Sequence, residues 1–190
     1  MSTTQSNVQD VRMPDPNFVH PELIPAETAG AKAARYVAAL TRVSLGFTFL
    51  WAFIDKLIGL DHATPAARAW LNGGSPTSGY LKGVEGPFGS LYNGLAGNAF
   101  LDWLFMLGLL GIGVALILGI GMRVAAVAGS ALLVLMWTAS LPLANNPFLD
   151  DHLVYALVLV LLALVGAGRT WGLGSAWERL PIVRDHSSLR

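Results

Sequence analysis

The chain of 190 residues contains no cysteine and only four histidines. The lack of cysteine excludes disulfides, thiolate nucleophiles, iron–sulfur ligation and thiol–quinone exchange chemistry. A haem held by paired histidines inside a membrane is not expected either, because only His152 directly adjoins a long apolar run. No flavin or metal motif is recognisable. The glycine-rich piece GLLGIG lies inside an apolar run and does not follow a strand, which argues against a nucleotide site.

Charge is scarce as well. Charged residues make up 13% of the chain and the formal net charge is zero, so no basic patch favours nucleic acid as a partner. Apolar residues are abundant: 54% of the chain is hydrophobic and the mean hydropathy is +0.55. This balance is typical of an integral membrane protein whose main environment is the lipid bilayer.

Four apolar runs are long enough to cross a bilayer, whose core of about 30 Å needs roughly 20 helical residues. They cover residues 36–59, 100–120, 123–143 and 150–168. Small residues recur every four positions in the second and third runs, at Gly111, Ala115, Gly119, Ala125 and Gly129. Such stripes favour close helix packing. The expected fold is an all-α membrane protein, built as a bundle of four transmembrane helices.

The other segments are more polar. Residues 1–35 carry several prolines among polar side chains, which predicts a disordered tail, and residues 169–190 are predicted as a second tail. Residues 60–99 are too many for a structureless loop, so we expect a structured cap on one membrane face, with a mobile loop as the alternative. Within this segment Thr64 and Pro65 predict the start of a short helix, AARAWL, that stops at Asn72.

The distribution of lysine and arginine predicts the orientation in the membrane. The side that holds both termini carries Lys32, Arg35, Arg42, Arg123, Arg169, Arg179, Arg184 and Arg190. The other side carries Lys56, Arg68 and Lys82. We therefore expect a multi-pass plasma-membrane protein with both termini in the cytoplasm. Residues 60–99 and the turn NNPFLDDH, residues 145–152, would then face outward.

Polar side chains occur at the outward end of every predicted helix. The candidate catalytic residues are Lys56, as a cation that meets an anion or a quinone carbonyl, and His152, as a proton donor or acceptor, with Asp151 beside it. The candidate substrate-binding residues are Arg42, Asp55, Asp102, Trp137, Asn145, Asn146 and Asp150. Of these, Arg42 is expected at the opposite, cytoplasmic boundary.

The same residues also allow a structural interpretation. Lys56 can extend to lipid headgroups or pair with Asp102 or Asp150. Asn-Pro marks a turn, Asp150 can cap the fourth helix, and Asp151 in its first turn interacts favourably with the helix dipole. Both interpretations stay open at this point.

Several segments resemble the DoxX family of small four-helix membrane proteins, and more closely the DoxD-type subunit of thiosulfate:quinone oxidoreductase. The resemblance is carried by RVSLGFTFLWAFIDKLIGL, AWLNGGSPTSGYL, DWLFMLGLLGIGVALILGIGMRVAAVAG and ANNPFLDDHLVYALVLVLLALVGAGRTWGLG. These pieces fall within about residues 36–175.

The resemblance implies oxidation of thiosulfate to tetrathionate, with membrane quinone as the electron acceptor and a second, smaller redox subunit as partner. The quinone is expected to enter between helices near Trp51, Trp103 or Trp137. DoxX-like chains in other contexts organise membrane redox partners. A non-catalytic scaffold or accessory subunit of a respiratory or oxidative-stress complex is therefore the alternative function.

Overall fold

The computed structural model describes residues 27–189, and the elements within this range are helices, turns and bends, with no strand. Three helices are long and apolar enough to cross a membrane: α1 (Ala29–Ile58), α4 (Ala99–Leu118) and α5 (Met122–Ala139). A fourth apolar helix, α6 (Asp151–Leu164), has 14 residues and falls short of that length. Over residues 27–189 the protein is therefore all-helical, with three candidate membrane spans.

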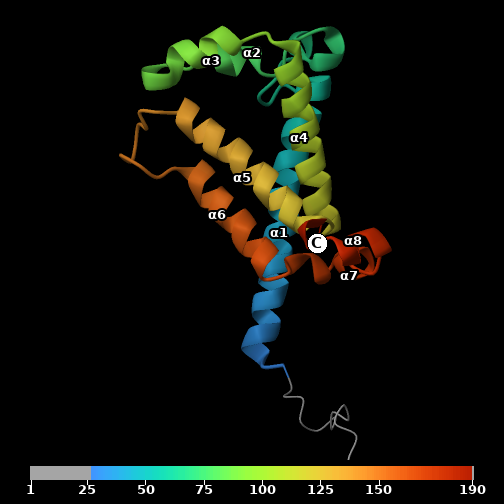
Figure 1. Ribbon diagram of the computed structural model, residues 1–190. Coiled ribbons are helices and arrows are strands. Elements are labelled where there is room, and N and C mark those ends of the chain that lie inside the picture. Colours follow the sequence, from blue (N-terminus) through green and yellow to red (C-terminus); the bar gives the residue numbers. More distant parts are fainter. Residues whose placement is uncertain (1–26, 190) are drawn as a thin grey trace, which may run out of the picture.

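Two helix pairs form the bundle. Helix α1 packs mainly on α4, and α5 packs mainly on α6. The pairs are joined by the α4–α5 turn, where they meet, and they spread apart toward the other end (Figure 1). We call the meeting end, with residues 119–121 and 165–189, the base. The opposite end, with residues 59–98 and 140–150, is the cap end.

Glycines allow close approach within both pairs. A Cβ at Gly113 would lie 2.8 Å from the backbone nitrogen of Leu50, and one at Gly129 would lie 2.6 Å from Leu159 Cδ1. The sequence stripe therefore identified Gly129 correctly. The prediction of close packing was wrong for Gly111, where an added Cβ would meet no atom within 4 Å. The face of α4 that packs on α1 carries Gly113 instead.

Helix α1 begins earlier than its hydropathy indicates. The hydroxyl of Thr28 accepts a hydrogen bond from the Ala31 N–H at 3.2 Å, and an alanine-rich stretch follows. Alanine has the highest helix propensity, so residues 29–35, predicted as part of the tail, are helical. The rest of that tail, residues 1–26, lies outside the described residues. At 30 residues, or about 45 Å, α1 projects past the base (Figure 1).

The segment between α1 and α4 lies across the cap end as a series of short helices (Figure 1). These are η2 (Ala66–Arg68), η3 (Trp70–Asn72), α2 (Ser78–Lys82), η4 (Gly86–Phe88) and α3 (Gly89–Leu95). The predicted helix AARAWL is split at Ala69, which is extended, into the two turns η2 and η3. Thr64 does not cap it, because its hydroxyl bonds to Asp55.

The C-terminal residues, predicted as a tail, are folded against the end of α4 and form part of the base. They form η5 (Ala167–Arg169), α7 (Gly174–Trp177), α8 (Pro181–Asp185) and η6 (Ser187–Leu189). The Leu173 N–H donates to the Leu118 carbonyl at 2.7 Å, and Val183 is fully buried. Burial of apolar side chains explains why this segment is ordered despite its charges.

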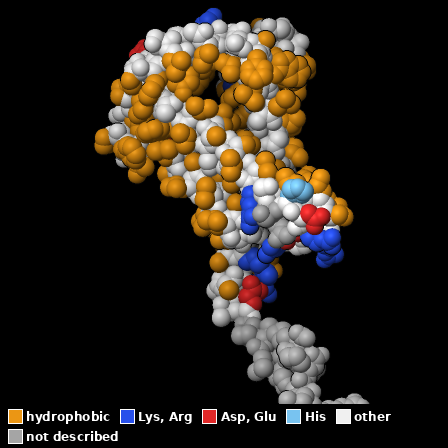
Figure 2. Space-filling view, viewed as in Figure 1, with side chains coloured by type: hydrophobic (Ala, Val, Ile, Leu, Met, Phe, Trp, Pro, Cys, Tyr) orange, Lys and Arg blue, Asp and Glu red, His pale blue; other side chains and the backbone are white. Residues whose placement is uncertain are grey.

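Side-chain type follows the same division into ends. In Figure 2, hydrophobic side chains cover much of the visible helix surface, while most of the visible charged side chains gather around the base and the projecting part of α1. Exposed residues such as Leu107, Leu157 and Leu164 place large apolar groups on this surface. Exposed apolar side chains of this kind are suited to contact with lipid.

Candidate functional site

Asp55 ends α1 as a buried carboxylate, 2% exposed, and not as a solvated end residue. Its two oxygens accept hydrogen bonds from the backbone N–H groups of Leu60 at 3.2 Å, His62 at 3.4 Å and Ala63 at 3.2 Å. These bonds fold the chain back directly after the helix. Asp55 was predicted to bind substrate, but its oxygens are occupied by its own loop.

Asp102, in the first turn of α4, does the same for the next part of the segment. Its Oδ1 accepts hydrogen bonds from the Ser75 hydroxyl at 2.9 Å, the Thr77 N–H at 3.1 Å and the Thr77 hydroxyl at 2.6 Å. Both Asp102 and Thr77 are buried. The SPT piece, residues 75–77, is therefore the docking point of the segment on α4.

Lys56 is half-buried at the same end of α1. Its Nζ lies over the ring of Phe105, 5.9 Å from the ring centre, which is a cation–π contact. Within the described part of the chain, the carboxylate of the adjacent Asp55 interacts with it electrostatically. The pairing with Asp102 or Asp150 that the sequence allowed is not formed, because these carboxylates bond to other groups.

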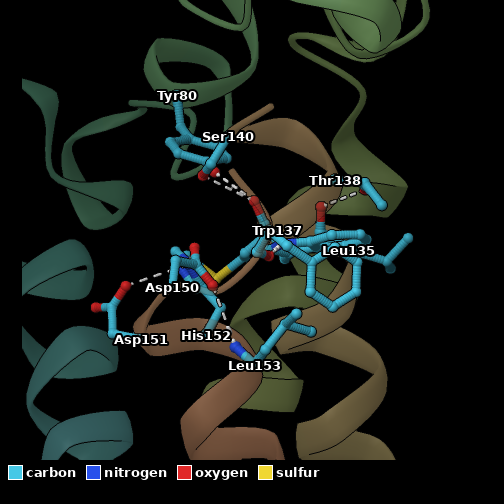
Figure 3. A network of polar contacts seen from close by, with 11 residues as sticks. Tyr80, Leu135, Trp137, Thr138, Ser140, Asp150, Asp151, His152 and Leu153 are labelled. Carbon is cyan, nitrogen blue, oxygen red and sulfur yellow. Dashed lines mark hydrogen bonds and ion pairs between the residues drawn. The ribbon is translucent and has the colours of Figure 1, made fainter. Parts of the chain in front are cut away.

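His152 and its acidic neighbours form the most concentrated polar group at the cap end. His152 Nδ1 lies 2.6 Å from Asp150 Oδ2 and 3.7 Å from Asp151 Oδ1. The His152 and Asp150 side chains are 19% and 16% exposed, whereas Asp151 is 69% exposed. Figure 3 shows this group at the start of α6, beside Trp137 and below Tyr80. Its ligand atoms lie within 4.8 Å of one another, an arrangement that could hold a metal ion.

Asp150 has two roles in this group. Its Oδ1 accepts the Leu153 N–H at 3.2 Å and so caps α6, as the sequence predicted, while its Oδ2 holds the imidazole. Burial on its own would raise the pKa of Asp150. The hydrogen bonds from the His152 ring and the Leu153 N–H, with the charge of His152, outweigh burial and leave the pKa below its usual value.

The turn before α6 is fixed by two other predicted site residues. Asn146 Oδ1 accepts hydrogen bonds from the N–H groups of Phe148 and Leu149, both at 2.9 Å. The indole N–H of Trp137 donates to the Phe148 carbonyl at 3.0 Å, and the two rings contact edge to face. Trp137 therefore holds this turn. Asn145 is exposed.

A groove of about 540 Å³ opens between α2 and the end of α5. We call it the cap groove; it is lined by Gly79, Tyr80, Gly83, Val84, Glu85, Ala139, Ser140, Leu141 and Pro142. The Tyr80 and Ser140 hydroxyls both donate to the Met136 carbonyl, at 3.3 and 2.9 Å, on the wall nearest Trp137 (Figure 3). Nothing in the sequence pointed to Ser140 or Glu85.

Arg42 lies at the base, far along α1 from Lys56, and is completely buried. Its Nη1 donates to the carbonyls of Leu116 and Ile117 at the end of α4, and its Nη2 donates to those of Thr170 at 3.2 Å and Trp171 at 2.9 Å. These four carbonyls are the internal hydrogen-bond partners of the buried guanidinium. Arg42 therefore joins three segments at the base and is not part of the cap-end group.

The predicted site residues thus divide into two kinds. Asp55, Asp102, Asn146 and Trp137 hold the loops of the cap end, and Arg42 holds the base. The second kind is His152, Asp151 and Lys56. Their charged or titratable groups contact other side chains and do not hold those loops. Comparison of the chain with family models, curated proteins and solved structures gave no significant match.

Proposed function

We propose that this chain is a DoxX-like, DoxD-type subunit of a thiosulfate:quinone oxidoreductase in the plasma membrane. In this proposal α1, α4, α5 and α6 form a four-helix bundle with both termini in the cytoplasm and the cap end outside. Helix α6 is about 21 Å long, and the exposed apolar Phe148, Leu149 and Val165 beside its ends lengthen its apolar surface toward the thickness of a bilayer core.

The observation that carries the proposal is the imidazole–carboxylate pair of His152 and Asp150. A histidine held at 2.6 Å by a partly buried carboxylate is an arrangement suited to proton transfer, because the carboxylate fixes the orientation of the ring. Reduction of a quinone needs such a group. Asp151, 3.7 Å away and exposed, connects the imidazole with the outer solution.

The overall reaction balances with two protons. Two thiosulfate ions lose one electron each and join through a new S–S bond, and the quinone takes up both electrons and two protons to become a quinol. In the proposed scheme His152 delivers a proton to a quinone oxygen and is reprotonated from outside. Lys56 attracts the thiosulfate dianion to the cap end.

The cap groove has properties that suit a quinone head. Its volume of about 540 Å³ lies within the range of small-molecule sites, and its wall combines apolar residues with the hydroxyls of Tyr80 and Ser140. The groove adjoins the segment that leads to Trp137 and α6 (Figure 3). A ring in the groove would therefore lie near the proton donor.

The test is thiosulfate-dependent reduction of a soluble quinone analogue by the purified protein, with an absorption spectrum recorded on the same sample. His152→Ala should lower the rate by about a hundredfold, the effect of losing one general acid. Ser175→Ala, an exposed change at the base, should leave the rate unchanged. Equal rates with and without thiosulfate would overturn the proposal.

A non-catalytic scaffold is the second candidate, and one observation favours it. Four of the predicted cap-end site residues are bonded to the protein's own loops, which makes the cap end a rigid surface. A pull-down in mild detergent distinguishes the two functions. Stoichiometric capture of an oxidoreductase, together with no activity of the isolated chain, would favour the scaffold.

A further inference from the structure

The base contains a second cavity, of about 180 Å³, which the proposed function does not use. Three segments form it: the α4–α5 turn with the start of α5, the end of α6, and the C-terminal residues 168–178. We call it the base cavity. Its volume is below the range of drug-sized ligands, so it suits a compact chemical group.

The charged side chains that line the base cavity are Arg123, Arg169 and Glu178, so the lining carries one net positive charge. Arg169 and Glu178 form an ion pair, with Nε to Oε1 at 3.1 Å and Nη2 to Oε2 at 3.1 Å, and the arginine is 60% exposed. The start of α5 adds further positive potential. Its N-cap is Gly121, so no side chain caps the helix there.

A buried cation behind the wall points to an anion as the ligand. Arg42 is fully buried, its recorded partners are all backbone carbonyls, and its Nε has no hydrogen-bond partner in the described part of the chain. A Cβ on Gly119, which lines the cavity, would lie 2.8 Å from Arg42 Nη1. One glycine therefore separates the cavity from a buried positive charge that lacks a carboxylate, and a buried charge is costly without a counter-ion.

The mouth of the cavity is apolar on one side. Leu164 and Val165 line it and are 80% and 57% exposed, and they continue the apolar surface of α6. A free anion gains nothing from these side chains, whereas a lipid places its acyl chains there and its phosphate among the arginines. We propose that the base cavity binds the phosphate group of an anionic membrane phospholipid.

The test measures lipid binding by the purified full-length protein in neutral detergent, by native mass spectrometry and by the shift in thermal unfolding. The probes are phosphatidylglycerol, phosphatidylcholine and inorganic phosphate, added separately. Phosphatidylglycerol should bind most tightly. Arg123→Gln should weaken that binding roughly tenfold, the effect of losing one charge-assisted hydrogen bond, while Arg179→Gln, outside the cavity, should leave it unchanged.

Glu178→Gln should have the opposite effect to Arg123→Gln on lipid binding. It removes the competing carboxylate and frees Arg169, so phosphatidylglycerol should bind more tightly, which a purely structural role of these side chains does not predict. Equal affinity of the wild type and Arg123→Gln would overturn the proposal, as would weaker binding by Glu178→Gln. Stabilisation by inorganic phosphate but not by phosphatidylglycerol would overturn the assignment to lipid.

Discussion

At the scale of single residues, buried polar side chains hold together segments that are distant in sequence. Asp102 lies on α4 and binds Ser75 and Thr77, which precede it by more than 20 residues. The SPT piece and an acidic residue at a helix start were both visible in the sequence. Their pairing was not, because no local pattern specifies which loop will reach a given helix end.

The strength of this docking can be measured with one hydroxyl. Thr77→Val keeps the shape of the side chain but removes a donor at 2.6 Å from a buried carboxylate, so it should lower the free energy of unfolding by about 1–3 kcal/mol. Tryptophan fluorescence during thermal unfolding would report the change.

Thr48→Val is the matched control for that substitution. Thr48 is exposed on α1 and bonds only within its own helix, to the Ser44 carbonyl, so its replacement should change stability by less than about 0.5 kcal/mol. Equal stability of the two variants would contradict a docking role for Thr77.

At the scale of elements, helix α6 was recognisable from its apolar run, and its Asp150 cap and acidic first turn were predicted correctly. Its end was not. The prediction extended to residue 168, but α6 ends at Leu164, and Gly166, with φ +64°, begins a turn into η5. Hydropathy continues through Val165 and Ala167, so apolar character alone could not locate the stop, although glycine at that position is typical of a helix end.

The start of α6 should make stability depend on pH. The pKa of Asp150 is lowered in the folded protein, so its contribution is fully present above the unfolded-state pKa of about 3.9 and is lost as the pH falls through the lower folded-state value. Thermal unfolding of the wild type and Asp150→Asn, measured from pH 7 to pH 3, tests this.

Asparagine is the appropriate replacement because it still caps the helix but does not titrate. The stability advantage of the wild type over Asp150→Asn should shrink at the acidic end of this range. A difference that stays constant, or grows, as the pH falls would contradict the proposed role of the carboxylate.

At the scale of the whole molecule, the sequence predicted a helical membrane protein, and the three long apolar helices agree with this. It did not predict that the helices form two pairs that spread toward the cap end (Figure 1). That arrangement depends on Gly113 and Gly129, whose importance follows from which helix faces meet. It also did not predict that residues 169–189 fold against the end of α4 and help form the base.

The orientation of the molecule can be tested because the chain has no cysteine of its own. Single variants Asn145→Cys at the cap end and Ser175→Cys at the base place an exposed thiol at each end. A membrane-impermeant thiol reagent should label Asn145→Cys on intact cells and Ser175→Cys only after permeabilisation. The wild type is the unlabelled control, and the reverse pattern would show that the molecule is inverted.

The buried guanidinium at the base has a consequence for how the chain is made. Arg42 belongs to α1, yet the carbonyl of Thr170 that it binds follows 128 residues later. At about 5–20 residues per second, roughly 6–26 s of synthesis separate the cation from that partner. The carbonyls of Leu116 and Ile117 are made earlier, but the full set of partners is complete only once Thr170 and Trp171 follow, so the final seating of α1 at the base is a late event in synthesis.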